Sequence, residues 1–302
     1  MSGPRIFDRH LLRARRARAR ALGPATFLID RVAEDLAERL SAVLRTFDVA
    51  VDLGTPTDAL RRALAGSNKV ATLIAAAPEA AALGAAFPRV AADEEALPFA
   101  DASLDLVVSA LALQFVNDLP GTLIQIRRAL KPDGLFLAAL IGGDSLTELR
   151  EAFAQAESEV EGGLSPRIAP FADLRDLGAL LQRAGFALPV TDSDRLTVRY
   201  DTPFALMRDL RAMGATNVLN ERRRTPLKRA TLLRMAEIYA EHFADADGRL
   251  RATFEIAWLS GWAPHESQQK PLKPGSATAR LADALGTREV PTGDKASGPR
   301  RS

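Results

Sequence analysis

The feature that most constrains the fold is an alternation of short apolar runs and helical stretches between residues 48 and 141. The runs near residues 105 and 135 are continuously apolar, as strands buried on both faces of a parallel sheet are. Such strand–helix alternation predicts a doubly wound α/β sheet with helices on both faces. The predicted strands are Asp48–Leu53, Val70–Ile74, Val90–Ala92, Asp105–Ala112 and Leu135–Ile141.

Helical spacing of apolar residues in the first part of the chain predicts N-terminal helices within residues 1–47, followed by a domain over residues 48–285. Residues 203–250 show helical spacing with almost no strand pattern, so we expect a helical insertion there. The tail 286–302 is rich in Gly, Pro and charge and is expected to be disordered. The remaining helices and strands are expected at 145–159, 171–184, 195–200 and 253–259.

Cysteine is absent, and the three histidines, His10, His242 and His265, lie far apart in sequence. Disulfides, Cys-ligated zinc, iron–sulfur clusters and thiol nucleophiles are therefore excluded, and we expect no metal site. A net charge of +2 gives no reason to expect nucleic acid as a partner. The longest apolar runs are too short to span a membrane, and we expect a cytoplasmic protein.

The segment from residue 5 to residue 20 is rich in arginine. One interpretation is an arm that binds nucleic acid or a membrane, or a transit peptide. The favoured interpretation is a solvated helix that packs on the domain edge through Ile6, Phe7, Leu11 and Leu12, because charge runs are usually solvated faces.

The first predicted strand ends in Asp52-Leu-Gly54, an arrangement that opens nucleotide or nucleoside sites in many α/β domains. Glycines usually follow, since a Cβ would obstruct contact between ligand and backbone. Here Pro56 offers no N–H and fixes its own φ. Asp58 is expected to place a negative charge close to the ligand, where a carboxylate would be repelled by roughly 4 kcal/mol at about 4 Å.

Four segments in fixed order resemble the class I S-adenosylmethionine (SAM) dependent methyltransferases. This resemblance implies a Rossmann-like fold with a seven-stranded, mostly parallel sheet, an antiparallel last strand and a helical insertion between the last two strands. The segments are Val51-Asp-Leu-Gly54, Ala92-Asp-Glu-Glu-Ala-Leu-Pro-Phe99, Asp105-Leu-Val-Val-Ser-Ala110 and Arg128-Ala-Leu-Lys-Pro-Asp-Gly134.

Further segments narrow the resemblance. Leu210-Arg-Ala-Met-Gly-Ala-Thr-Asn217 resembles the helical insertion of the malonyl-carrier methyltransferases of biotin synthesis. Phe7-Asp-Arg9 and the segment from Trp262 to Leu272 resemble the family of assembly factor 5 of respiratory complex I, over roughly residues 5–285. That family implies a complex I subunit as partner, arginine hydroxylation rather than methyl transfer, and peripheral association through a membrane complex.

The resemblance also implies which residues contact SAM. Asp52 and Gly54 match the loop that wraps its methionine end, and Asp93 matches the acid that holds the adenine amino group. The acid that takes the ribose hydroxyls is missing, since Ala75 and its neighbours stand there; such a loss costs about 1.5–3 kcal/mol. With Pro56 and Asp58 in the loop, the pattern predicts a weakened SAM site. The full set of predicted SAM contacts is Asp52, Gly54, Asp93, Glu94, Ser109 and Ala110.

Three functional hypotheses remain. The chain is a complex I assembly factor, an active SAM-dependent methyltransferase on a small molecule or carrier-bound acid, or a non-catalytic binding protein on a decayed enzyme scaffold. Gln114 and Phe115 follow the fourth strand, where substrate-facing groups are expected. The sequence identifies no catalytic residue, although His265 beside Glu266 has the chemistry of an acid–base pair.

Overall fold

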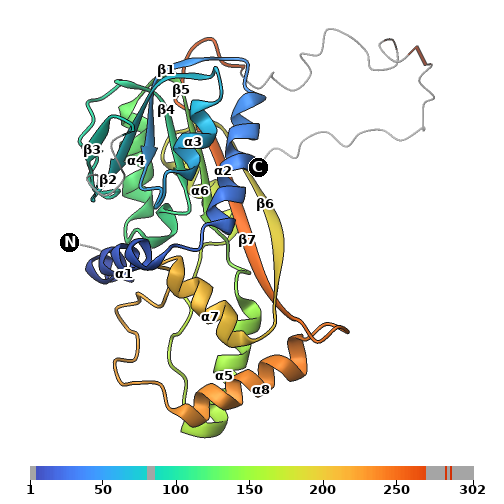
Figure 1. Cartoon of the computed structure of the whole chain (residues 1–302). Coiled ribbons are helices and arrows are strands. Elements are labelled where there is room, and N and C mark those ends of the chain that lie inside the picture. The colour runs from blue at the N-terminus through green and yellow to red at the C-terminus, as the bar shows by residue number, and fades with distance from the viewer. Residues whose placement is uncertain (1–4, 80–85, 270–282, 284–285, 288–302) are drawn as a thin grey trace, which may run out of the picture. The chain divides into compact units, whose positions relative to one another are not determined.

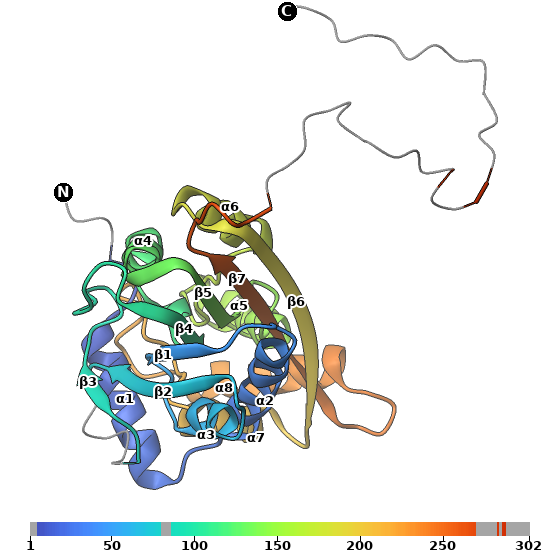
Figure 2. The same ribbon diagram turned by 90° about the horizontal axis from the view of Figure 1, so that it is seen from above.

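A seven-stranded sheet in the order β3-β2-β1-β4-β5-β7-β6 organises the computed structural model, which describes residues 5–79, 86–269, 283 and 286–287 (Figures 1 and 2). Neighbouring strands from β3 to β5 are parallel, and β7 runs antiparallel to both β5 and β6. The predicted fold is thus confirmed, including its antiparallel last strand. The strands are β1 Phe47–Leu53, β2 Val70–Ala77, β3 Arg89–Ala91, β4 Leu104–Ala110, β5 Leu130–Ile141, β6 Ala187–Tyr200 and β7 Leu250–Trp262.

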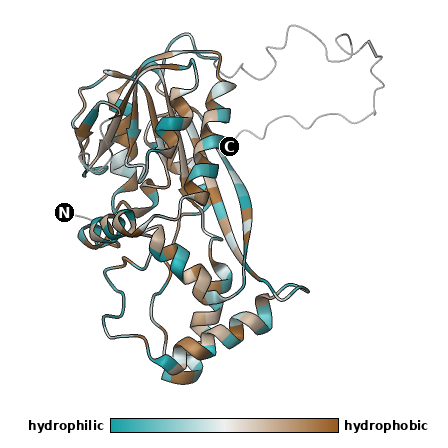
Figure 3. Cartoon of the chain, viewed as in Figure 1, coloured by the Kyte–Doolittle hydropathy of each residue, from teal (hydrophilic) through white to brown (hydrophobic). Residues whose placement is uncertain are grey.

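Helices cover both faces of the sheet and enclose two hydrophobic cores, with α2 and α3 on one face and α4 and α6 on the other (Figure 2). Successive strand residues serve opposite cores, since Ala50 faces the first core and Val51 the second. Hydrophobic residues dominate the central strands (Figure 3). The helices are α1 Arg9–Leu22, α2 Phe27–Ser41, α3 Ala59–Ala65, α4 Leu119–Ala129, α5 Thr147–Glu161, α6 Leu174–Arg183, α7 Pro203–Ala212 and α8 Arg229–Phe243, with a 3₁₀ turn η2 at Leu113–Phe115.

The insertion between β6 and β7 contains α7 and α8, as predicted, and α8 packs along α5. The segment between α7 and α8 is not helical. Gly214 has a φ of +69°, a left-handed conformation that ends α7, and residues 214–228 form an irregular connection. This connection lies next to α1.

Helix α1 departs most clearly from prediction. Phe7 and Leu12 are buried as expected, but the helix is not a solvated charge run. Arginines at positions 9, 13, 16 and 20 recur at the spacing of one helical face, and that face points into the domain. Arg9, Arg13 and Arg20 form ion pairs there with carboxylates.

Residues from Met1 to His265 form one compact unit, and Glu266–Ser302 a separate one. The predicted disordered tail, 286–302, lies outside the described residues except for Gly286 and Thr287, and the domain boundaries stay predictions. In the described part of the chain, the helices all fall short of the length and apolarity needed to cross a membrane.

Candidate cofactor and substrate site

The loop after β1 is held by a hydroxyl group. The Thr55 Oγ1 donates to the Asp52 carboxylate and accepts the Ala110 N–H at 3.0 Å. The Ser109 hydroxyl donates to the Leu53 carbonyl at 2.7 Å. Ser109 and Ala110 therefore join the ends of β4 and β1 from within the protein, and neither lines the recess or the cavity described below.

Asp52 lies under this loop in a buried ion pair with Arg61 of α3, and each residue is 1% exposed. Burial raises the pKa of Asp52 to about 6, against the opposing influences of Arg61 and Thr55. Two of the Arg61 nitrogens, Nε and Nη2, are buried without a hydrogen-bond partner among the described residues. Asp52 thus supports the loop instead of presenting its carboxylate to a ligand.

Gly54 is a position where glycine is required. Its φ is +73°, and a Cβ there would lie 2.6 Å from Glu94 Oε1 and 3.1 Å from the Ala112 Cβ. Glu94 follows β3 and is only 2% exposed. The predicted SAM contacts Gly54 and Glu94 are therefore brought together at the carboxyl edge of the sheet, where α/β domains place ligands.

The acids after β3 already have partners on α1. Arg9 donates to Asp93 at 2.9 Å and also contacts Glu94, and Arg13 lies 2.5 Å from the second Asp93 oxygen. The Arg9 and Glu94 side chains are 13% and 3% exposed, so this pair is shielded from solvent. Asp93, which was predicted to hold the adenine amino group, and the neighbouring predicted contact Glu94 are thus both neutralised by arginines of the chain itself.

At the end of β2, Ala75 is buried against Asp52 and Arg89 and carries no polar group, as the sequence indicated. An acid nevertheless lies nearby, since Glu79 follows the strand by two residues and pairs with Arg20 of α1. The strand was expected to end at Ile74, whereas β2 runs to Ala77, so Glu79 lies closer to the strand end than its sequence position indicated. Its position just after Pro78 was the signal that could have found it.

These groups surround a recess of about 30 Å³, lined by the arginine face of α1 on one side and by Gly54, Ala77, Glu79 and Glu94 on the other. A space of this size holds about two water molecules. While α1 holds this position, the nucleoside of SAM does not fit between the guanidinium groups and the loop.

Asp58 lies away from both spaces. Its carboxylate pairs with Arg62 at 2.8 Å, is 45% exposed, and lines neither the recess nor the cavity. The repulsion of a ligand carboxylate by Asp58 stays a prediction. Pro56 lines both spaces, and Thr57 lines the cavity.

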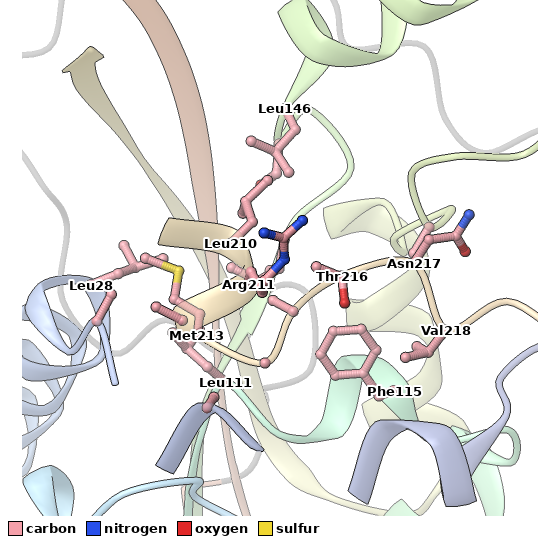
Figure 4. Close-up of a pocket in the computed structure, with 18 of the residues that line it drawn as sticks. Leu28, Leu111, Phe115, Leu146, Leu210, Arg211, Met213, Thr216, Asn217 and Val218 are labelled. Atoms are coloured by element: carbon pink, nitrogen blue, oxygen red, sulfur yellow. The ribbon is translucent and has the colours of Figure 1, made fainter. Parts of the chain in front are cut away.

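Next to the recess lies a cavity of about 280 Å³, enclosed by α1, α2, α5, α7 and the connection after α7. Figure 4 shows Phe115, Leu210, Arg211, Thr216 and Val218 around it. Both residues predicted to face a substrate, Gln114 and Phe115, line this cavity. Its other walls are mostly apolar and include Leu28, Ile29, Leu111, Ile141, Leu146, Leu149, Phe153, Met207, Met213 and Phe254.

The charged side chains that line the cavity are Arg16, Arg20, Arg167 and Arg211, and no described acid is among them. Glu157 neutralises Arg167, and Glu79 neutralises Arg20. Arg16 and Arg211 have no ion-pair partner in the described ranges.

Arg16 lines both spaces and lies over the Phe115 ring at 5.7 Å. Loss of water around it lowers its pKa to about 10. Gln114 Oε1 is buried without a donor among the described residues. The cavity can therefore bind a ligand that carries an anionic group on an apolar body. The arginines would contact the anionic group, and Gln114 Oε1 would accept a hydrogen bond from the ligand.

Comparison with known proteins agrees with this architecture. Residues 48–138 match the model of a methyltransferase domain. The chain is 39% identical over 290 residues to "Arginine-hydroxylase NDUFAF5, mitochondrial" of Danio rerio, with 93% of this chain and 90% of that protein covered. The protein of the same name from Homo sapiens is 41% identical over 286 residues, with 92% and 83% covered.

A second group of relatives matches a shorter part. "Malonyl-[acyl-carrier protein] O-methyltransferase" of Xylella fastidiosa (strain M23) is 44% identical over 172 residues, which cover 57% of this chain and 56% of that protein. Among solved structures, a methyltransferase-like protein (BH2331) of Bacillus halodurans C-125 superposes with a TM-score of 0.52 at 15% identity, covering 77% of this chain and 99% of that one. At that identity the likeness concerns the fold alone.

Proposed function

Because the chain belongs to the methyltransferase-fold family that includes arginine-hydroxylase NDUFAF5, we propose that it is an enzyme of the complex I assembly factor 5 type, which acts on a subunit of respiratory complex I. One observation carries this proposal. The similarity extends over more than nine tenths of this chain, far beyond the 48–138 domain, and so reaches into the helical insertion. A fold shared without function would not require that part to match.

The family cofactor implied by a methyltransferase domain is SAM, but the recess has no room for its nucleoside while α1 is in place. We therefore assign no chemical step to SAM. In the proposed function, the residues that line the cavity beside the insertion bind a segment of the partner subunit.

The test is deletion of the gene in its own organism. We expect less assembled complex I and the loss of one oxygen atom from an arginine-containing peptide of a subunit, measured by native gels and peptide mass spectrometry. A strain rescued with the wild-type gene is the positive control. Rescue with the Arg175→Gln variant, which changes an exposed residue of α6, should restore complex I equally well. Unchanged complex I and unchanged peptide masses in the deletion strain would refute the proposal.

A second candidate function is methyl transfer to an organic acid, either small or carrier-bound. The specific observation in its favour is the cavity, where unpaired Arg16 and Arg211 and the absence of described acids favour a carboxylate over a guanidinium. The malonyl-carrier relatives support it over part of the chain. Under this alternative the deletion strain keeps complex I but lacks a methyl ester that the wild type makes, and it needs added biotin for growth where that ester is a precursor of biotin.

A further inference from the structure

We propose that α1 is an internal competitor for the nucleoside position, whose arginines take the carboxylates that a nucleoside cofactor would need. Cofactor binding then requires α1 to leave the sheet edge. This goes beyond the proposed function, since it concerns the loading of the site and not the reaction performed there.

The first support is charge. Asp93, Glu94 and Glu79 come from two separate segments at the sheet edge, and each is paired with a guanidinium of one helix face, Arg9, Arg13 or Arg20. A buried carboxylate and guanidinium stay paired unless both find new partners, because a lone buried charge is strongly disfavoured. An incoming nucleoside has to replace the contacts that Arg9 makes with Glu94.

The second support is space. The recess beside Gly54 is limited to about 30 Å³ by the α1 side chains that line it. A Cβ added to Gly54 would overlap the Glu94 side chain, so there is little free space between the loop and this acid. Arginine side chains and a nucleoside therefore exclude each other at this position.

The third support is the attachment of α1 to the insertion. The Asp8 N–H donates to the Val218 carbonyl at 2.8 Å, and the Asn220 N–H donates to the Ile6 carbonyl at 2.9 Å. Arg222 pairs with Asp8 at 3.2 Å. A Cβ on Gly214 would lie 3.0 Å from the Arg16 Cα.

These contacts join the start of α1 to the wall of the cavity. A partner segment that displaces residues 214–222 would therefore pull α1 from the recess. The same event that fills the cavity would then open the recess to a cofactor.

The test measures binding of S-adenosylhomocysteine and of adenosine by calorimetry. In the double variant Arg9→Gln with Arg13→Gln, Asp93 and Glu94 lose their arginine partners on α1. We expect this variant to bind the two ligands at least about tenfold more tightly than the wild type does. That gain corresponds to removing a blocked state that holds about 90% of the wild-type molecules. The control with the same change in net charge is Arg18→Gln with Arg175→Gln, two exposed residues, which should bind like the wild type. Circular dichroism melts verify that both variants are folded.

A second measurement uses the absence of cysteine in the chain. In Ile6→Cys with Asn220→Cys, positions that face each other beside the Phe7–Leu219 bridge, a disulfide would hold α1 to the insertion. We expect the oxidised form to bind adenosine about tenfold more weakly than the form reduced with dithiothreitol. Reduction has no disulfide to act on in the wild type.

Equal or weaker binding by the Arg9→Gln with Arg13→Gln variant would overturn the proposal. Weaker binding would mean that these arginines contact the ligand, and equal binding would mean that they have no effect on it. Equal binding by the oxidised and reduced disulfide variant would overturn the need for α1 to move. Neither result depends on complex I, so the proposal and the proposed function can fail separately.

Discussion

The recess and the cavity share a wall but differ in how their charges are satisfied. Around the recess every described carboxylate has an arginine partner on α1, and the remaining space is about 30 Å³. The cavity is about 280 Å³ in volume, has mostly apolar walls, and includes the guanidinium groups of Arg16 and Arg211, which form no ion pair with an acid in the described ranges. The carboxylates around the recess are paired without a ligand, whereas two of the arginines that line the cavity are not.

This difference indicates which region a ligand approaches first. Filling the recess requires breaking shielded ion pairs, whereas filling the cavity satisfies charges that are already unpaired. An anionic or partner-derived group is therefore expected to enter the cavity before any nucleoside enters the recess.

Asp52→Ala tests how far the recess depends on its buried support. The substitution leaves Arg61 buried without a counter-charge, and we expect a loss of about 3–5 kcal/mol in the free energy of unfolding, measured by urea titration. The control is Asp58→Ala, whose partner Arg62 is 61% exposed, with an expected loss of at most about 1 kcal/mol. Similar losses in the two variants would show that the buried pair is not special.

Gly54→Ala tests the close contact between loop and acid. The new Cβ would meet Glu94 at 2.6 Å in a left-handed backbone conformation, so we expect a loss of about 1–3 kcal/mol, read from thermal melts. Gly163→Ala, with nothing within 4 Å of its Cβ, serves as control and should change stability by less than about 0.5 kcal/mol. A tolerated Gly54→Ala would mean that Glu94 is free to move.

Arg211→Gln tests the cavity charge. Arg211 is exposed and makes no ion pair in the described ranges, so stability should stay within about 0.5 kcal/mol of the wild type. Affinity for an apolar anion such as anilinonaphthalene sulfonate should fall about fivefold, or about 1 kcal/mol, in fluorescence titration. The exposed Arg208→Gln, which does not line the cavity, is the matched control. Unchanged affinity in Arg211→Gln would contradict an anion-binding cavity.

Glu161→Gln tests the pH dependence of the insertion. Hydrogen bonds from Thr231 and Arg223 lower the pKa of Glu161 to about 2. An acid with a lowered pKa stabilises the folded state above its unfolded pKa of about 4.5, and this stabilisation is lost as the pH falls towards 2. The wild type should therefore be more stable than the variant at pH 6, and the two should converge near pH 2 in acid melts. A constant difference across this range would refute the assignment.

Much of the fold could be predicted because its signal is local. The strands β1, β4 and β5 consist mainly of apolar residues. The predicted bounds of β1 and β4 lie within two residues of those observed, whereas β5 begins at Leu130, before its predicted start at Leu135. Most of β6 was missed, since Asp192, Ser193 and Asp194 look like a loop. They lie on an exposed edge strand that pairs with only one neighbour, where polar residues are tolerated.

The site was predictable only in part, for a physical reason. Gly54 and Glu94 follow from the spacing of strands and turns, which fixes where parallel strands end. The arginine face of α1 could not be assigned to the recess, because its acids lie some 80 residues away and no local pattern joins them. The spacing of Arg9, Arg13, Arg16 and Arg20 was visible, but a charged stripe alone does not say whether it meets water or acid. Likewise, the hydroxyl of Thr55 gave no sign that it would support the loop.

The two attachments of α1 also differ in when they can form during synthesis. Arg13 and Asp93 are 80 residues apart, whereas Asp8 and Arg222 are 214 apart. On the ribosome, where N-terminal parts fold first, α1 can reach the acids of the sheet long before the insertion exists. The insertion can add its contacts to α1 only after strands β1 to β6 have been made. We therefore expect a fusion at the N-terminus to weaken the contact between α1 and the insertion more than the pairing of those strands.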